Sequence, residues 1–215
     1  MTSETHLIDC MELMAKYPDN YFDLAVVDPP YGIGVNQMRM GGRKTIEPTN
    51  KTWDNKIPTA DYFNELFRVS KNQVIWGGNY FPLPNSQYFA IWDKGETMYG
   101  RDFAECEYAW INKGGTRIFK HTPNQLDRTH PTQKPIALYD WIFSKYAKQC
   151  YKILDTHLGS QSSRIAAYKA GLDFVGSELD PDYFRDGNQR FEDFKMQFEQ
   201  EIGVEKVLKG QARLF

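Results

Sequence analysis

The chain has 215 residues, of which 41% are hydrophobic and 25% charged, and its formal net charge is -2. This length predicts one α/β domain with a sizeable core. No apolar run reaches the length of a membrane span, and the N-terminus lacks a signal-peptide pattern. The three cysteines are widely spaced and form no CxxC pair, which argues against a disulfide framework or a zinc site and predicts a cytoplasmic protein.

Strands and helices alternate along the chain. Short apolar or β-branched runs predict strands, in chain order, at 6–8, 24–27, 73–76, 88–92, 107–111, 151–154 and 174–178. Helical spacing and helix-start residues predict helices at 11–14, 61–69, 135–146, 163–170 and after Pro181. Strand 24–27 is continuously apolar, which is typical of a strand buried on both faces of a parallel sheet.

A carboxylate, two prolines and an aromatic ring, Asp28-Pro29-Pro30-Tyr31, follow that buried strand. In open α/β sheets, ligands bind beyond the carboxyl ends of the strands. The two prolines remove two backbone donors, so nearby carbonyls can accept hydrogen bonds from a ligand. This combination fits an exocyclic amino group on a flat heterocycle. The alternative is a strand followed by a proline-rich turn in which Tyr31 only packs.

Two polar segments, 35–57 and 112–129, lack apolar periodicity and are rich in basic residues. A structureless stretch as long as the first is usually a lid, a binding loop or disorder. The acidic residues concentrate elsewhere, so the net charge does not exclude an acidic ligand such as a nucleic acid. Solvated loop charges would explain the same pattern without a ligand.

A second turn between strand and helix follows Asp155 and contains Gly159. A glycine there lets a ligand approach the backbone and the N–H groups at the start of the helix. The next strand ends at Glu178, where a carboxylate can accept both hydroxyls of a ribose. Because the full GxGxxG series is missing, a nucleoside with a small charged tail fits better than a pyrophosphate. An ordinary βαβ turn with a solvated Glu178 is the alternative.

The segment His130-Pro131-Thr132-Gln133-Lys134-Pro135 precedes a predicted helix. Lys134 offers a point charge for a carboxylate, and the Thr132 hydroxyl adds a hydrogen-bond donor. Taken alone, the segment fits a proline-bounded helix cap with an exposed lysine better than a ligand site.

Together these motifs resemble the DNA amino-methyltransferases that use S-adenosylmethionine, in the group whose DPPY block precedes the cofactor block. The match extends from Asp9 through Asp28–Tyr31, 74–80 and HPTQKP to Asp155 and Glu178, and so covers most of the chain. The resemblance implies a Rossmann-like methyltransferase fold: an α/β domain over 1–215 with a mostly parallel, seven-stranded sheet and helices on both faces.

The resemblance also implies the cofactor, S-adenosyl-L-methionine, and roles at matching positions. Asp28, Pro29, Pro30 and Tyr31 are the implied catalytic block. The implied cofactor residues are Asp9, Cys10, Asp28, Thr132, Lys134, Asp155, His157, Gly159, Ser160, Gln161, Ser162, Glu178 and Leu179. Asp9 and Cys10 are expected beside the adenine, Glu178 at the ribose, and Thr132 and Lys134 at the methionine end.

The implied chemistry suits these residues. The lone pair of an adenine amine is delocalised into the ring, which makes the amine a poor nucleophile. If Asp28 and the Pro29 carbonyl accept its two N–H bonds, the nitrogen can pyramidalise toward the methyl group. Tyr31 is expected to stack on the target base, which must leave the double helix to reach the pocket.

Two departures from the family pattern concern the cofactor turn. Thr156-His157 stands where the family usually has Pro-Phe, and Gln161 stands where it usually has Gly. A positive φ at Gln161 would cost about 1–3 kcal/mol of strain, which keeps an inactive DNA-binding relative open. Asp28 favours adenine N6 over cytosine N4, whose enzymes more often carry Ser there. A cytosine-N4 DNA methyltransferase and an RNA adenine methyltransferase also stay open.

Double-stranded DNA is the expected partner, and a homodimer is a further hypothesis. The residues expected to contact DNA are Arg39, Arg43, Lys44, Lys51, Lys113, Arg117, Lys120 and Arg128. A short C-terminal tail is expected over 203–215. Its end, Gln211–Phe215, resembles the peptide by which bacterial replication proteins dock on the sliding clamp, with a frayed tail as the alternative. A small solitary enzyme of this kind suits a phage or mobile element.

Overall fold

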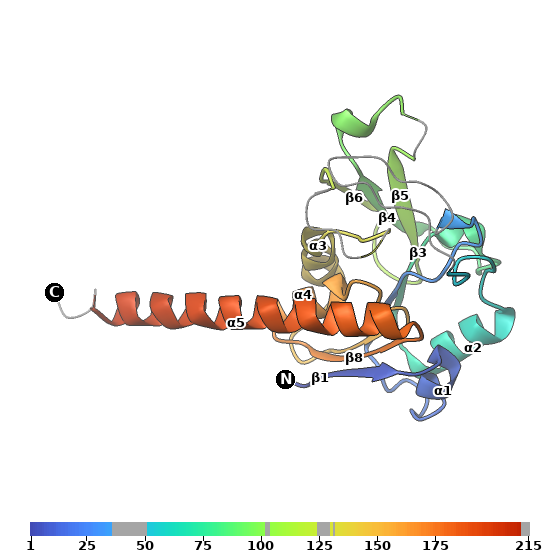
Figure 1. The fold of residues 1–215 in the computed structure, drawn as a ribbon. Helices are drawn as coiled ribbons and strands as arrows, with labels where there is room; N and C mark the ends of the chain where they lie inside the picture. The colour runs from blue at the N-terminus through green and yellow to red at the C-terminus, as the bar shows by residue number, and fades with distance from the viewer. Residues whose placement is uncertain (36–50, 102–103, 124–129, 131, 212–215) are drawn as a thin grey trace.

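The computed structural model describes residues 1–35, 51–101, 104–123, 130 and 132–211, with side chains described through residue 203. Within these ranges, eight strands form one sheet (Figure 1). The strands are β1 (Ser3–Leu7), β2 (Leu24–Val27), β3 (Gln73–Trp76), β4 (Tyr88–Asp93), β5 (Cys106–Ile111), β6 (Arg117–Lys120), β7 (Lys152–Asp155) and β8 (Asp173–Glu178). The helices are α1 (Cys10–Met14), α2 (Ala60–Val69), α3 (Ile136–Tyr146), α4 (Ser162–Lys169) and α5 (Pro181–Gln211), with short 3₁₀ turns η2 (Gly78–Tyr80) and η3 (Glu96–Met98).

The sheet order is β1-β8-β7-β2-β3-β5-β4-β6. The five strands from β1 to β3 are parallel to their neighbours, β5 is antiparallel to both β3 and β4, and β6 is parallel to β4. The prediction of a mostly parallel Rossmann-like sheet is confirmed. The carboxyl ends of the parallel strands therefore meet at one edge, where a ligand site is expected.

The predicted count of seven strands is wrong because β6 lies inside the segment 112–129, which lacks apolar periodicity. Residues 117–120 pair with Ala90–Asp93 at the outer edge of the sheet. Arg117, Ile118 and Lys120 are exposed, and Phe119 is the one residue of β6 that packs inward. Backbone pairing therefore forms this edge strand without the alternating pattern that would reveal it in the sequence.

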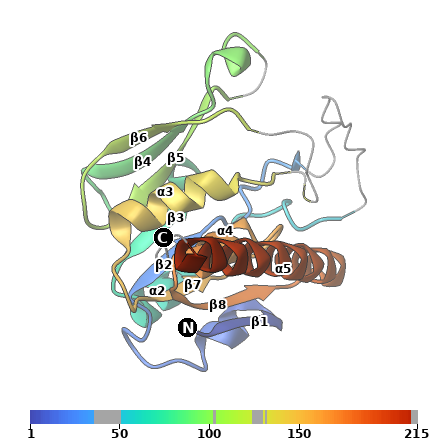
Figure 2. The ribbon, with the colours of Figure 1, turned by 90° about the vertical axis from the view of Figure 1, so that its left-hand side faces the viewer.

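Helices cover both faces of the sheet, as predicted. Leu24 and Val26 of β2 face the core formed with α3 and α4, while Ala25 and Val27 face the core formed with α1 and α2. Figure 2 shows α3 and α4 together on one side of the sheet. The continuous apolar run of β2 is thus explained by a strand that is covered on both faces.

The C-terminal segment differs from the predicted short tail, because α5 continues as a helix to Gln211. Figure 1 shows α5 extending well beyond the sheet. Phe191 is buried against Tyr168, whereas Phe194 and Phe198 stack on each other and are only half-buried. The clamp-like residues 212–215 lie outside the described residues. No helix in the described part of the chain is long and apolar enough to cross a bilayer.

Candidate active site

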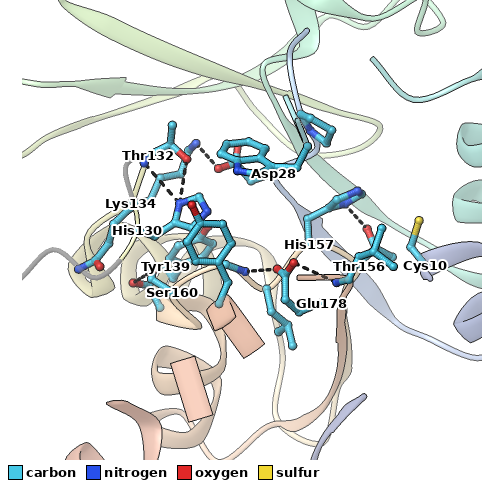
Figure 3. A pocket seen from close by; sticks show the side chains of 18 of the residues that line it. Cys10, Asp28, His130, Thr132, Lys134, Tyr139, Thr156, His157, Ser160 and Glu178 are labelled. Carbon is cyan, nitrogen blue, oxygen red and sulfur yellow. Dashed lines mark hydrogen bonds and ion pairs between the residues drawn. The ribbon is translucent and has the colours of Figure 1, made fainter. Parts of the chain in front are cut away.

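A pocket lies at the carboxyl edge of the parallel strands, where the ends of β1, β2, β7 and β8 converge (Figure 3). It is lined by Ile8, Asp9, Cys10, Asp28, Pro30, Trp53, His130, Thr132, Gln133, Lys134, Tyr139, Thr156, His157, Leu158, Gly159, Ser160, Ser162, Glu178, Leu179 and Tyr183. The structure therefore brings together the three motifs, which are far apart in the sequence.

Glu178 and Gly159 form one wall of the pocket. The Gly159 N–H donates to Glu178 Oε2 at 2.8 Å, and the N–H groups of Leu179 and Asp180 donate to Oε1 at 2.9 Å. Burial raises the pKa of Glu178, and these three N–H bonds oppose that shift. A carboxylate offers about four lone-pair sites, so with three N–H donors about one site stays available for a ligand hydroxyl. Glu178 is therefore held in a fixed orientation and can still accept a hydrogen bond from a ligand.

Asp9 and Cys10 line the pocket next to Ile8, at the end of β1. Asp9 caps α1 by accepting a hydrogen bond from the Met11 N–H at 2.8 Å. Burial and the nearby Asp9 carboxylate raise the pKa of the Cys10 thiol to about 12, so the thiol stays neutral at physiological pH. The neutral thiol of Cys10 thus lies beside the carboxylate of Asp9 in the pocket wall.

Two predicted cofactor residues, Asp155 and Gln161, do not line the pocket. Asp155 lies beneath the turn, where it accepts hydrogen bonds from the His157 N–H and the Ser163 hydroxyl, and burial raises its pKa to about 7. Gln161 is fully buried next to Gly187 of α5, and its Oε1 accepts from Arg164. Both side chains bind protein groups in and around the turn, and their direct contact with a cofactor stays a prediction.

The positive φ expected at Gln161 is present, with φ 58° and ψ 27°.

The other departure from the family pattern, Thr156-His157, forms part of the pocket wall. The Thr156 hydroxyl contacts the Tyr62 hydroxyl at 2.6 Å and His157 Nδ1 at 2.9 Å. Burial lowers the pKa of His157 to about 4, so its ring is neutral at physiological pH.

The Asp28 carboxylate is held on both of its oxygens. Its Oδ1 accepts from the Tyr31 hydroxyl at 2.6 Å, and its Oδ2 accepts from Lys134 Nζ at 2.5 Å. The pKa of Asp28 is raised above its usual value, because burial and the nearby Glu107 carboxylate outweigh the lowering by the Lys134 ammonium. Asp28 is thus an acceptor with two fixed donors and spare lone pairs.

Lys134 lines the pocket, its ammonium is paired with two protein carboxylates, and its contact with the methionine end stays a prediction. Its side chain is 3% exposed, and besides Asp28 its Nζ pairs with Glu107 Oε2 at 3.2 Å. Thr132 also lines the pocket, with its N–H and hydroxyl next to His130 Nδ1. The HPTQKP segment therefore forms part of the pocket wall and also binds Asp28 of the Asp28–Tyr31 block through Lys134.

Tyr31 lies between Gly77 and Tyr80. The rings of Tyr31 and Tyr80 stack with centroids 4.7 Å apart and an interplanar angle of 10°. A Cβ at Gly77, which has φ +69°, would lie 2.2 Å from Tyr31 Cε1. The glycine after β3 therefore makes room for the Tyr31 ring, and only a residue without a side chain fits there.

Several residues of the site carry no sequence signal and are missed by sequence reasoning. Asp54, 1% exposed, accepts from the N–H groups of Tyr31, Gly32 and Val35 at 2.7, 3.0 and 2.8 Å. Trp53 and Tyr183 form an aromatic cluster at the pocket with His130, which belongs to the HPTQKP segment; the ring centroids lie 4.3–6.4 Å apart. Tyr139 of α3 completes the wall. These residues meet only through the tertiary fold.

The residues predicted to contact DNA are partly described. Lys51 pairs with Asp180 at 2.5 Å and Asp182 at 3.1 Å, so its charge is already balanced near the pocket. Lys120 pairs with Glu96 at 2.8 Å, and Lys113 and Arg117 are exposed on the β4–β6 side of the sheet. Arg39, Arg43, Lys44 and Arg128 lie outside the described residues.

Comparison with known proteins finds similarity to DNA methylases. Residues 85–189 match the N6_N4_Mtase family model, described as DNA methylase. Over 204 residues the chain is 26% identical to the "Putative methylase YubD" of Escherichia coli (strain K12), covering 85% of this chain and 87% of that protein. Just under half of the chain is thus similar to the N6/N4 DNA methylases. The family match includes HPTQKP, the Gly159 turn and Glu178, and it begins after the Asp28–Tyr31 block.

Solved structures of methyltransferases share the fold of this chain. The M1.HpyAVI–SAM complex superposes with a TM-score of 0.59 at 16% identity, covering 87% of this chain and 98% of that chain. The PvuII DNA methyltransferase (cytosine-N4-specific) superposes with a TM-score of 0.58 at 11% identity, covering 93% of each chain. At these identities the likeness concerns the fold, and the choice between adenine N6 and cytosine N4 is left open.

Gly77→Ala is expected to displace the Tyr31 ring and lower the free energy of unfolding by about 2–4 kcal/mol, from strain at positive φ and overpacking. Gly171→Ala is the matched control, because Gly171 has φ +70° and open space around its Cβ position. Urea unfolding measures both. Equal losses in the two variants would show that φ alone matters and that residue 77 does not confine the Tyr31 ring.

Asp54→Asn is expected to destabilise the Asp28–Tyr31 turn by about 1.5–3 kcal/mol, because an amide nitrogen would replace one of the two oxygens that accept from three N–H groups. Hydrogen exchange at Tyr31, Gly32 and Val35 measures the local effect. Protection of these amides at the wild-type level would contradict the inferred role of Asp54.

Proposed function

We propose that this methyltransferase transfers a methyl group from S-adenosyl-L-methionine to the exocyclic N6 amine of adenine in double-stranded DNA. The observation that carries the proposal is the shared pocket: the Asp28 carboxylate at the end of β2 lines the same pocket as Glu178 and Asp9. Asp28 offers an acceptor for an amine, and Glu178 and Asp9 offer acceptors for a nucleoside.

The chemistry of the lining fits S-adenosylmethionine. Glu178 is available to accept a ribose hydroxyl, and Asp9 and Cys10 lie next to Ile8, against which an adenine ring would pack. The hydroxyls of Thr132, Ser160 and Ser162 offer donors for the carboxylate of the methionine end. When bound, the cofactor supplies a methyl group activated by a sulfonium. M1.HpyAVI was solved in complex with SAM, which supports this assignment by analogy of fold.

Asp28 orients the target amine. One N–H of the amine donates to a spare lone pair of Asp28 and the other to the Pro29 carbonyl, so the nitrogen lone pair faces the methyl group. As the N–C bond forms, the C–S bond breaks and its electron pair stays on sulfur; one N–H proton then passes to the Asp28 carboxylate. Positioning and fixed charges supply most of the acceleration in this scheme.

The flipped base is expected to stack at Tyr31. One face of that ring is covered by Tyr80, which is 41% exposed and can therefore move aside. Stacking on a base contributes about 1–3 kcal/mol, comparable with the cost of extruding the base. Tyr31 and Tyr80 thus provide the aromatic surface for the target base.

Asp28 favours adenine over cytosine, by the family resemblance of the DPPY block. Lys113, Arg117 and Lys120 on the β4–β6 side stay predictions for DNA contact, as do the cytoplasmic location, the homodimer and the clamp-binding tail.

The test is to incubate the protein with S-adenosylmethionine and unmethylated DNA, digest to nucleosides and analyse them by mass spectrometry. N6-methyladenine is the expected product. N4-methylcytosine would overturn the inference from Asp28, and methylation of RNA alone would move the substrate to RNA adenines. No methylated base in either nucleic acid would favour an inactive binding protein.

Asp28→Ala is expected to lower turnover by about 10²–10⁴-fold, because the amine loses its oriented acceptor, while affinity for S-adenosylhomocysteine stays near the wild-type value. Glu178→Ala is the reciprocal variant: its S-adenosylhomocysteine affinity should fall by about tenfold or more, because ribose loses a charged acceptor. Calorimetric titration and steady-state kinetics measure the two quantities. Loss of cofactor affinity in Asp28→Ala as large as in Glu178→Ala would contradict the division of roles.

A further inference from the structure

We propose that Lys134 is a positioning residue that holds Asp28 ionised and oriented for the target amine, and that Glu107 and Lys94 hold Lys134 in turn. This inference rests on the proposed methyl transfer. Asp28, Lys134, Glu107 and Lys94 are called the buried charge chain below. In this proposal the lysine of HPTQKP binds the Asp28 carboxylate, and it does not bind the methionine end of the cofactor.

The buried charge chain is continuous and comes from four separate segments. Lys134, just before α3, contacts Asp28 Oδ2 at 2.5 Å and Glu107 Oε2 at 3.2 Å. Glu107 of β5 contacts Lys94 Nζ, after β4, through its other oxygen at 2.7 Å. The exposed fractions of the four side chains are 19% for Asp28, 3% for Lys134, 24% for Glu107 and 13% for Lys94. The chain thus connects the antiparallel part of the sheet to the end of β2.

The charges of the chain balance, with two carboxylates against two ammonium groups. Lys134 sits between both carboxylates, and removal of its charge would leave Asp28 and Glu107 facing each other in a buried site. Like charges in that position favour protonation of one carboxyl. A protonated Asp28 loses acceptor capacity and can no longer take a proton from the amine.

Other charged or titratable groups around Asp28 do not replace Lys134. Tyr31, in the turn after β2, donates a neutral hydroxyl to Oδ1. Tyr139 of α3 and Asp155 of β7 also interact with Asp28, and neither brings a positive charge. Among the groups described around Asp28, Lys134 is therefore the cation in direct contact with its carboxylate.

The geometry also separates Lys134 from the methionine end. Its ammonium already faces two carboxylates and lies 5.6 Å from the Tyr31 ring and 5.5 Å from the Trp76 ring. A cofactor carboxylate at Nζ would place a third anion around one ammonium. The hydroxyls of Thr132 and Ser160 line the pocket without such competition and suit that carboxylate better.

The experiment compares the wild type with Lys134→Met, Lys134→Arg and Glu107→Gln, using kcat for DNA methylation against pH and affinity for S-adenosylhomocysteine. Lys134→Met should lower kcat at neutral pH about tenfold or more, with cofactor affinity within about twofold. The acid limb of the kcat–pH profile of Lys134→Met should move to higher pH by about one to three pH units, because Asp28 loses the cation that favours its ionised form. Lys134→Arg should restore part of kcat, and Glu107→Gln should move the acid limb to lower pH, because a like charge is removed.

Lys169→Met is the matched control, since Lys169 pairs with Asp140 outside the pocket; it should leave kcat and the pH profile unchanged. The ¹³C carboxyl signal of Asp28, assigned with Asp28→Asn, provides a readout without turnover: Asp28 should titrate at higher pH in Lys134→Met than in the wild type. A tenfold loss of S-adenosylhomocysteine affinity in Lys134→Met with unchanged kcat and Asp28 titration would overturn the proposal. An inactive wild type would refute the proposed function, while the Asp28 titration would still decide the role of Lys134.

Discussion

An ionised carboxylate at the end of a strand that is buried on both faces needs a compensating charge. Asp28 has that position, because β2 lies between β7 and β3 and its alternate residues pack into two cores. Desolvation alone would favour the neutral carboxyl. The Lys134 ammonium and the Tyr31 hydroxyl bind the two oxygens of Asp28 and fix its orientation, and the ammonium favours the charged form against the effect of burial. Lys134 of the HPTQKP segment supplies this charge, and Glu107 and Lys94 continue the series of ion pairs.

A second constraint is the conformation of the turn that carries Asp28. Two prolines and a tyrosine leave little freedom, and Asp54 binds the following N–H groups from a segment further along the chain. Lys51, from the same segment, pairs with Asp180 at the start of α5, next to Glu178. Segment 51–54 thus contacts the turn after Asp28 on one side of the pocket and Asp180, next to Glu178, on the other.

The parallel part of this fold is predictable from the sequence, because buried strands such as 24–27 and 151–154 carry apolar runs and end in acids. The pocket positions of Asp9, Cys10, Asp28, Gly159 and Glu178 are predictable too, since each lies at or just beyond the end of a strand. The strand β6 is not, because its exposed residues carry no alternation, and neither is the helical course of residues 203–211.

The protein partners of the site residues could not be predicted from the sequence. Residue type predicts ligand roles for Lys134 and Asp155, and the structure shows that both side chains also pair with protein groups. Pairing partners such as Glu107 and Asp54 come from distant segments, so no local pattern reveals them. Gln161 has the positive φ that its place in the turn predicts, yet its side chain points toward Arg164 and Gly187 and away from the pocket.

A crystal structure with S-adenosylhomocysteine and a duplex carrying the target adenine tests most directly whether Asp28, held by Lys134, receives the target amine. We expect the N6 amine within hydrogen-bonding distance of Asp28, with Lys134 still bound to the other side of that carboxylate. Lys134 bound to the cofactor carboxylate, with the amine away from Asp28, would contradict both roles.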